Sequence, residues 1–242
     1  MGWWWPLLVA PFVGSLLGVL IARLPHGMPV AWARSRCDHC GAALEPRDLV
    51  PLLSYAWLQG RCRRCLARIP AFHWQIEIAA TAVPLLALAA DIEGPGLWAV
   101  SVAGWLLIAL AWIDVDTMLL PDALTLPLFL TGLLATWWLR PEALVDHLIA
   151  AGLAYLLLRE VGVIYRRVRH REGLGAGDPK LLGAIGAWVG LVNLPVVLLG
   201  SALAGLAWAL LMRLRGTQIG MNTALPFGPF LALAAFLVLL AR

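Results

Sequence analysis

Long apolar runs recur along the chain and constrain its fold more than any other feature of the sequence. An α-helix rises about 1.5 Å per residue, so about 20 apolar residues cross the hydrocarbon core of a bilayer. The composition of 62% hydrophobic and 13% charged residues lies outside the range of soluble domains, which are about 45–50% apolar and about 25% charged. The sequence therefore predicts an all-α integral membrane protein. Eight spanning helices are expected at about 3–22, 75–90, 97–113, 122–139, 143–164, 180–193, 195–212 and 223–241.

Lysine and arginine residues are unevenly distributed between the two sides that these spans define. The segments 23–73, 159–180 and 213–222 all fall on one side and carry sixteen of the 18 Lys and Arg residues. Only Arg140 and Arg242 fall on the other side. Because cytoplasmic loops are enriched in Lys and Arg, we expect the three basic segments in the cytoplasm and both termini outside. Basic residues that lie between apolar spans set membrane orientation, so nucleic acid is not expected as a partner.

Two aspartates that are far apart in the sequence reach the same cytoplasmic face. Asp114 ends the third span, and Asp178 begins the sixth span within the stretch Gly175-Ala176-Gly177-Asp178-Pro179-Lys180. An ionisable residue at the edge of a span is costly and is by default a functional hypothesis. The structural alternative for Asp178 is a helix N-cap followed by proline at the first helical position. Asp122 is likewise expected to cap the fourth span.

Two carboxylates at one membrane face suggest acid–base hydrolysis of a peptide bond. Like charges that are held close cannot both ionise easily, so such a pair shares a proton. The ionised member can activate water, and the protonated member can hydrogen-bond the scissile carbonyl and protonate the leaving amine. The pair titrates as a unit, so the sequence does not assign which aspartate is the acid. Gly175 and Gly177 are expected to let the loop approach a substrate backbone, and Lys180 to contact substrate or a lipid headgroup.

Other functions are weighed against this one. No His-Glu-x-x-His sequence is present, which argues against a membrane zinc protease. Glu77 and Glu160 lie near the cytoplasmic ends of spans and are expected to form structural ion pairs, with a role as site residues as the alternative. The alternative function is a non-enzymatic membrane scaffold or a proton-coupled transporter that uses the same aspartates. A transporter should place its carboxylates near the midplane, whereas both of these lie at span ends.

The polar segment 25–73 contains all four cysteines as two C-x-x-C pairs with 21 residues between them: Cys37, Cys40, Cys62 and Cys65. This spacing predicts a four-thiolate zinc site, which would be structural because no position is left open for a substrate. Reduced thiols or a redox pair are the alternatives. A segment this small builds little core, so metal binding would stabilise its fold. We therefore expect a first transmembrane helix at 1–24, a cytoplasmic zinc-binding domain at 25–73 and a seven-helix membrane aspartyl protease domain at 74–242.

Five motifs stand in order along the chain. They are Gly14-Ser15-Leu16-Leu17 through Arg23-Leu24-Pro25; Ser35-Arg36-Cys37 to Cys40-Gly41 with Pro51-Leu52-Leu53-Ser54-Tyr55 and Gly60-Arg61-Cys62-Arg63-Arg64-Cys65; Ile113-Asp114-Val115-Asp116 with Leu120-Pro121-Asp122; Gly175-Ala176-Gly177-Asp178-Pro179-Lys180; and Leu225-Pro226-Phe227-Gly228-Pro229. In this order the chain resembles the bacterial prepilin peptidases, the type IV leader peptidase family of membrane aspartyl proteases with a G-x-G-D motif. It departs at Gly18, where the family usually has asparagine, and at Asp38, where the family usually has proline.

The resemblance implies cleavage of basic leader peptides from prepilin or pseudopilin precursors at the cytoplasmic face of the bacterial inner membrane. It implies Asp114 and Asp178 as the catalytic pair and the four cysteines as a zinc site. Many members also methylate the new N-terminal amine with S-adenosylmethionine, an activity associated with members that keep the cysteine loop. The expected partners are therefore prepilin-like precursors and membrane lipid, and the expected cofactors are zinc and S-adenosylmethionine.

Overall fold

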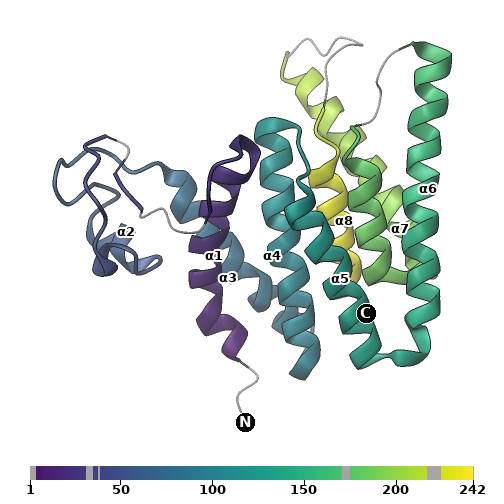
Figure 1. Ribbon diagram of the computed structural model, residues 1–242, viewed down its shortest axis with the longest axis horizontal. Coiled ribbons are helices and arrows are strands. Elements are labelled where there is room, and N and C mark those ends of the chain that lie inside the picture. The colour runs from purple at the N-terminus through teal and green to yellow at the C-terminus, as the bar shows by residue number, and fades with distance from the viewer. Residues whose placement is uncertain (1–3, 31–34, 38, 171–174, 217–224, 242) are drawn as a thin grey trace. The chain divides into compact units, whose positions relative to one another are not determined.

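The structure is a computed structural model that describes residues 4–30, 35–37, 39–170, 175–216 and 225–241. This part of the chain is helical and contains no β-strand, only two isolated bridges. Six of its helices are long and apolar enough to cross a membrane: α1 (Trp5–Arg23), α3 (Ala71–Ala89), α4 (Gly94–Thr117), α5 (Asp122–Leu139), α6 (Leu144–Arg169) and α7 (Asp178–Leu214). The apolar helix α8 (Gly228–Leu240) is shorter, and α2 (Leu53–Trp57) is a single turn (Figure 1). The expected all-α multi-pass membrane fold is confirmed.

Helix α7 holds two of the expected spans in one element. Gly190 has φ 70° and ψ 176°, so the helix kinks there, slightly before the predicted break at residue 194. At the kink, the Leu191 N–H donates to Asp146 Oδ2 at 3.0 Å, which satisfies a donor that the interrupted helix leaves free. A Cβ on Gly190 would lie 2.5 Å from that oxygen. The positive φ and the lack of space both require glycine here.

The chain divides into two compact units, Met1–Trp105 and Leu106–Arg242, and α4 crosses the boundary. In the first unit α1 packs on α3. The contact is close, because a Cβ on Gly14 would lie 2.6 Å from the Cα of Glu77. Small residues allow such approach between helices in a bilayer, where packing and not hydrophobicity holds helices together. The Trp105 indole adds a hydrogen bond to the Ala80 carbonyl at 2.8 Å.

Helix α7 lies at the centre of the second unit, where it contacts α5, α6 and α8. Its first half, Asp178 to Gly190, is buried except at Lys180. A Cβ on Gly186 would lie 2.8 Å from the Ala150 carbonyl oxygen of α6. On the α5 side, the Trp188 indole occupies the space that Gly132 leaves open and donates to the Leu128 carbonyl at 2.8 Å. These contacts hold the N-terminal half of α7 on both sides.

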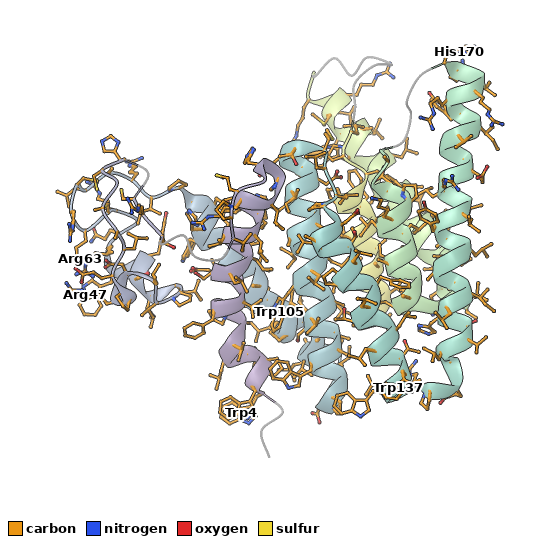
Figure 2. The ribbon with its side chains drawn as sticks, in the orientation of Figure 1. Trp4, Arg47, Arg63, Trp105, Trp137 and His170 are labelled. Atoms are coloured by element: carbon orange, nitrogen blue, oxygen red, sulfur yellow. The ribbon has the colours of Figure 1, made fainter. Side chains whose placement is uncertain are left out.

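The two ends of the second unit differ in chemistry. Figure 2 shows Trp137 near one end and His170, which follows the last residue of α6, at the other. The last turn of α6 before His170 carries Arg166, Arg167 and Arg169. Aromatic residues gather at membrane interfaces and arginines gather on the cytoplasmic side. Helix α7 begins after the short connection from the arginine-rich end of α6, so Asp178 belongs to that end.

Candidate active site and metal centre

Asp114 lies in the last turn of α4 and is 5% exposed. The helix ends because Met118 adopts a left-handed conformation, φ 55°, and its N–H donates to the Asp114 carbonyl at 2.9 Å. The Asp114 carboxylate accepts the Gly228 N–H at 2.9 Å through Oδ2. Gly228 is the first residue of α8, whose initial N–H groups have no partner within the helix. Asp116 is exposed, so the two aspartates of this motif have different environments.

Asp178 is the first residue of α7 and is also 5% exposed. Its carboxylate turns back toward the preceding loop, where Oδ2 accepts the Gly175 N–H at 3.0 Å. The structural alternative, Asp178 as an N-cap, is wrong, because Gly177 holds the cap position and no side chain caps the helix. Pro179 does stand in the first turn, as expected. The Asp178 carboxylate therefore does not cap its own helix and accepts a hydrogen bond from the preceding loop.

The Asp114 and Asp178 carboxylates lie close enough to interact electrostatically. Among the described residues neither one is paired with a basic side chain. Gly177 helps to bring them together, because a Cβ there would lie 2.6 Å from the Cβ of Leu120 in the connection between α4 and α5. A Cβ on Gly175 would lie 3.1 Å from Asp178 Oδ2. Close packing therefore leaves little room for a side chain at either position.

Lys180 forms an ion pair with Asp122. Its Nζ lies 2.7 Å from Asp122 Oδ1 and 3.0 Å from Oδ2, and both side chains are about half exposed. The expectation that Asp122 caps its own helix is wrong, because Pro121 is the N-cap of α5 and no side chain caps it. The pair instead joins the first turn of α5 to the first turn of α7.

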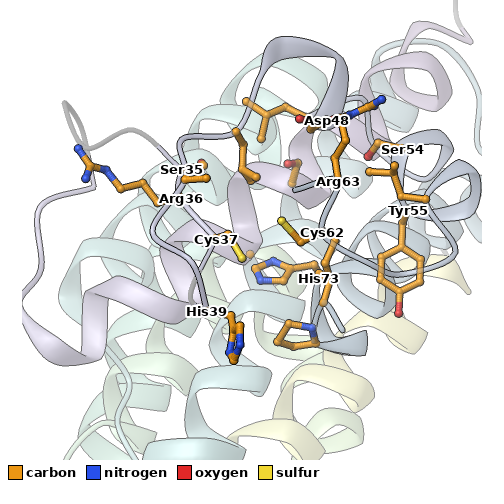
Figure 3. A pocket seen from close by; sticks show the side chains of 18 of the residues that line it. Ser35, Arg36, Cys37, His39, Asp48, Ser54, Tyr55, Cys62, Arg63 and His73 are labelled. Atoms are coloured by element: carbon orange, nitrogen blue, oxygen red, sulfur yellow. The ribbon is translucent and has the colours of Figure 1, made fainter. Parts of the chain in front are cut away.

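The four predicted cysteine ligands, Cys37, Cys40, Cys62 and Cys65, form one cluster. Their sulfur atoms all lie within 4.8 Å of one another, and the Cys37 and Cys65 sulfurs are 3.8 Å apart. A tetrahedral four-thiolate zinc site with bonds of about 2.3 Å separates its sulfurs by about 3.8 Å. The cluster therefore fits a metal ion of this kind. Figure 3 labels two of its members, Cys37 and Cys62.

The two cysteine pairs use the same backbone turn. The Cys37 N–H donates to the Ala42 carbonyl at 2.9 Å, and the Cys62 N–H donates to the Ala67 carbonyl at 2.8 Å. Backbone N–H groups of Cys65 and Arg64 donate to the Cys62 sulfur and lower the pKa of that thiol to about 6. The thiolate is the form that binds metal. This turn is therefore arranged for a metal ligand.

Glu77 does not have the ion-pair role expected of it. It is 9% exposed, and its Oε2 accepts the Leu52 N–H at 2.7 Å. No basic side chain among the described residues pairs with it. Leu52 has φ 61° and ψ −50°, a conformation that non-glycine residues rarely adopt. Glu160, the other glutamate expected to form an ion pair, is exposed on α6. Of the two departures from the family pattern, Gly18 is buried in α1, and Asp38 lies outside the described residues.

Comparison with known proteins covers nearly the whole chain. Residues 101–210 match the type IV leader peptidase family, and residues 8–91 match the bacterial peptidase A24 N-terminal domain. A prepilin leader peptidase/N-methyltransferase of Aeromonas hydrophila is 38% identical over 94% of this chain and 87% of the relative. The protein of the same name from Burkholderia pseudomallei (strain 1026b) is 40% identical over 91% of this chain and 79% of the relative. That of Pseudomonas aeruginosa is 34% identical, with 97% and 88% covered.

The chain belongs to the type IV leader peptidase family. No solved structure matches it.

One residue of the site was not predicted from the sequence. Gly228 was noted only as part of the motif Leu225-Pro226-Phe227-Gly228-Pro229, with no role of its own. The signal was a glycine directly before a proline at the start of an apolar run. Proline in the first helical turn marks a helix start, and glycine there allows another group to approach the free N–H. That approaching group is the carboxylate of Asp114.

Proposed function

We propose that this protein removes leader peptides from prepilin or pseudopilin precursors and then N-methylates the new N-terminus. The observation that carries the peptidase activity is the pair of buried carboxylates at two helix ends, Asp114 and Asp178, each bonded to one backbone N–H. Relatives that align with most of this chain are named for both activities. The peptidase and the methyltransferase are therefore proposed together.

In the proposed mechanism Asp114 and Asp178 are the catalytic residues and share one proton. The ionised carboxylate takes a proton from water as the water oxygen bonds to the scissile carbonyl carbon. The protonated carboxyl hydrogen-bonds the carbonyl oxygen and then gives its proton to the leaving nitrogen as the carbon–nitrogen bond breaks. The Gly228 and Gly175 N–H groups hold the two carboxylates in place throughout. Fixed donors of this kind need no rearrangement during the reaction.

Substrate contacts are proposed next to the pair. Gly175 and Gly177 carry no side chain that would cover Asp178, so an extended substrate backbone can approach it. Lys180 contacts the substrate or a lipid headgroup, for which its half-exposed ammonium group supplies a positive charge. Its ion pair with Asp122 holds that ammonium near the start of α7.

The proposed cofactors are a structural zinc ion and S-adenosylmethionine. Zinc would be held by the four clustered cysteines, whose sulfur spacing suits tetrahedral coordination. Metal binding then stabilises the segment between α1 and α3, whose described residues form only short helical turns. S-adenosylmethionine, when bound, supplies the methyl group for the new N-terminal amine.

The proposed location is the bacterial inner membrane, with the aspartate pair facing the cytoplasm. The arginine-rich end of α6 supports this orientation, because it leads directly into the stretch before Asp178. The scaffold and transporter alternatives are not favoured. Transported ions bind near the bilayer midplane, whereas Asp114 is in the last turn of α4 and Asp178 is the first residue of α7.

Cleavage of a purified prepilin tests the proposal. We would compare wild type with Asp114→Asn and Asp178→Asn, each purified in detergent with S-adenosylmethionine present. Asp116→Asn is the matched control, because Asp116 belongs to the same motif but is exposed. Mass spectrometry of the product reports both leader loss and an added methyl group. The two buried variants should each lose at least about a hundredfold in cleavage rate, and the control should cut like wild type. Equal cleavage by all four proteins would refute the aspartate pair.

A further inference from the structure

A cavity of about 830 Å³ lies in the first unit between the cysteine loop and the facing parts of α1 and α3 (Figure 3). Pockets that hold small organic ligands measure about 300–1,000 Å³, so this one has room for a nucleoside-sized molecule. Its wall includes three carboxylates, of Glu45, Asp48 and Glu77, and two metal-centre cysteines, Cys37 and Cys62. The aspartate pair in the second unit does not account for this cavity.

Two of the three carboxylates already have cationic partners. Glu45 pairs with Arg47 at 2.8 Å, and Asp48 pairs with Arg63 at 2.8 Å. Glu77 has no such partner among the described residues, although it is the most buried of the three. Its Oε2 accepts only the Leu52 N–H, and Oε1 accepts no hydrogen bond from the described residues. A buried carboxylate without a cation is costly. The wall at Glu77 is therefore suited to a positively charged ligand.

An aromatic surface lines the same cavity. The rings of Tyr55 and Trp74 stack with centroids 5.9 Å apart and an interplanar angle of 18°. Gly60 has φ 66°, and a Cβ there would lie 2.9 Å from the Tyr55 ring, so this glycine makes room for the tyrosine. Aromatic faces stack on planar rings and attract cations. Arginines also line the cavity, including Arg36 and Arg68, and suit a carboxylate on the same ligand.

We propose that this cavity binds S-adenosylmethionine, with Glu77 facing its positively charged sulfonium. The inference rests on the proposed N-methyltransferase activity, which requires a methyl donor but does not say where the donor binds. Each part of the ligand has a matching part of the wall. The planar base suits the Tyr55–Trp74 surface, the sulfonium suits the Glu77 carboxylate, and the amino acid carboxylate suits the arginines. Glu77 is assigned here as a donor-binding residue.

The test measures equilibrium binding of two ligands to the purified, metal-loaded full chain in nanodiscs. S-adenosylmethionine carries the sulfonium charge, and S-adenosylhomocysteine is its neutral thioether. Glu77→Gln removes the charge of Glu77 but keeps its size and an oxygen that can accept the Leu52 N–H. This variant should bind S-adenosylmethionine at least about tenfold more weakly, while S-adenosylhomocysteine binding changes much less. Glu160→Gln, at an exposed glutamate of α6, is the matched control and should bind both ligands like wild type.

Ultraviolet crosslinking of labelled S-adenosylmethionine locates the site without a mutation. Label recovered in peptides of segment 45–77 supports the proposal, and label confined to peptides after residue 105 overturns it. Unchanged S-adenosylmethionine binding by Glu77→Gln also overturns it. If that variant instead raises the KM for prepilin, the cavity binds the basic leader peptide. If wild type methylates prepilin and Glu77→Gln binds S-adenosylmethionine as wild type does, only the assignment of this binding site is refuted. A wild type that neither binds S-adenosylmethionine nor methylates prepilin refutes the proposed methyltransferase activity, and the site with it.

Discussion

The backbone N–H of Gly228 donates to Asp114 Oδ2 at 2.9 Å across 114 positions of sequence. A Cβ on Gly228 would lie 2.7 Å from the same oxygen, which is closer than real Cβ contacts allow. Only glycine therefore permits this hydrogen bond without moving the carboxylate. The first residue of α8 thus fixes the position of one member of the proposed catalytic pair.

Replacing Gly228 tests that dependence. Gly228→Ala should displace the Asp114 carboxylate and lower prepilin cleavage by about a hundredfold, because small displacements of catalytic groups have effects of this size. Cleavage rates at saturating prepilin would be compared with those of Gly205→Ala. Gly205 is the control because a Cβ there would meet its nearest atom, in Phe230, at an ordinary 3.5 Å. A folded Gly228→Ala protein that cuts like wild type would contradict the role given to this hydrogen bond.

Variants of the ion pair between Lys180 and Asp122 can distinguish a structural role of Lys180 from contact with the substrate. Lys180→Met and Asp122→Asn both remove the pair, and each should change the free energy of unfolding by less than about 1 kcal/mol because the pair is half exposed. If Lys180 contacts the substrate, only Lys180→Met should raise the KM for prepilin. Steady-state kinetics of the two variants gives the comparison. The same KM in both would argue that Lys180 serves only its pair with Asp122.

Removal of the metal should expose one unusually reactive thiol. Backbone N–H groups of Cys65 and Arg64 lower the pKa of the Cys62 thiol to about 6, and the thiolate is the reactive form. After chelation under reducing conditions, alkylation of Cys62 by iodoacetamide should rise with pH and reach half of its maximal rate near pH 6. Peptide mass spectrometry reads each cysteine separately, and added zinc should protect all four. Equal reaction of the four thiols with a midpoint near the ordinary value of about 8.5 would contradict the prediction.

The two cysteine turns differ at one matching position, which predicts a stabilising substitution. After the second cysteine of each pair stand Gly41, with φ 68°, and Leu66, with φ 59°. A left-handed conformation costs a non-glycine residue about 1–2 kcal/mol, and Leu66 is 65% exposed, so little packing is lost with its side chain. Leu66→Gly should raise the free energy of unfolding by up to about 1 kcal/mol, after the greater flexibility of glycine in the unfolded chain is subtracted.

Thermal unfolding of metal-loaded protein would measure this gain. Gly41→Leu is the reciprocal variant and should lower the midpoint, because it introduces the same strain into the first turn. A lower midpoint for Leu66→Gly would show that Leu66 has a packing role that its exposure does not reveal.

Several features followed from the sequence because they depend on composition or on short spacings. The apolar runs predicted the spans, and the C-x-x-C pairs predicted the cysteine cluster that the structure brings together. The cap expected at Asp122 and the ion pair expected at Glu77 were wrong for one shared reason. Each carboxylate found a partner outside its own helix, and the local sequence does not contain that information. Asp122 bonds to Lys180 and Glu77 to Leu52.

The sequence by itself determined the membrane class, the family and the residue types at the site, because hydropathy and motif spacing are properties of neighbouring residues. Only the tertiary structure decided which groups meet: Gly177 against Leu120, Gly228 on Asp114, and Glu77 without a cation beside a cavity. The physical reason is that helix packing at small residues sets which distant backbone donors reach a carboxylate. That packing depends on how two helices fit together, so it cannot be predicted from the sequence of either helix alone.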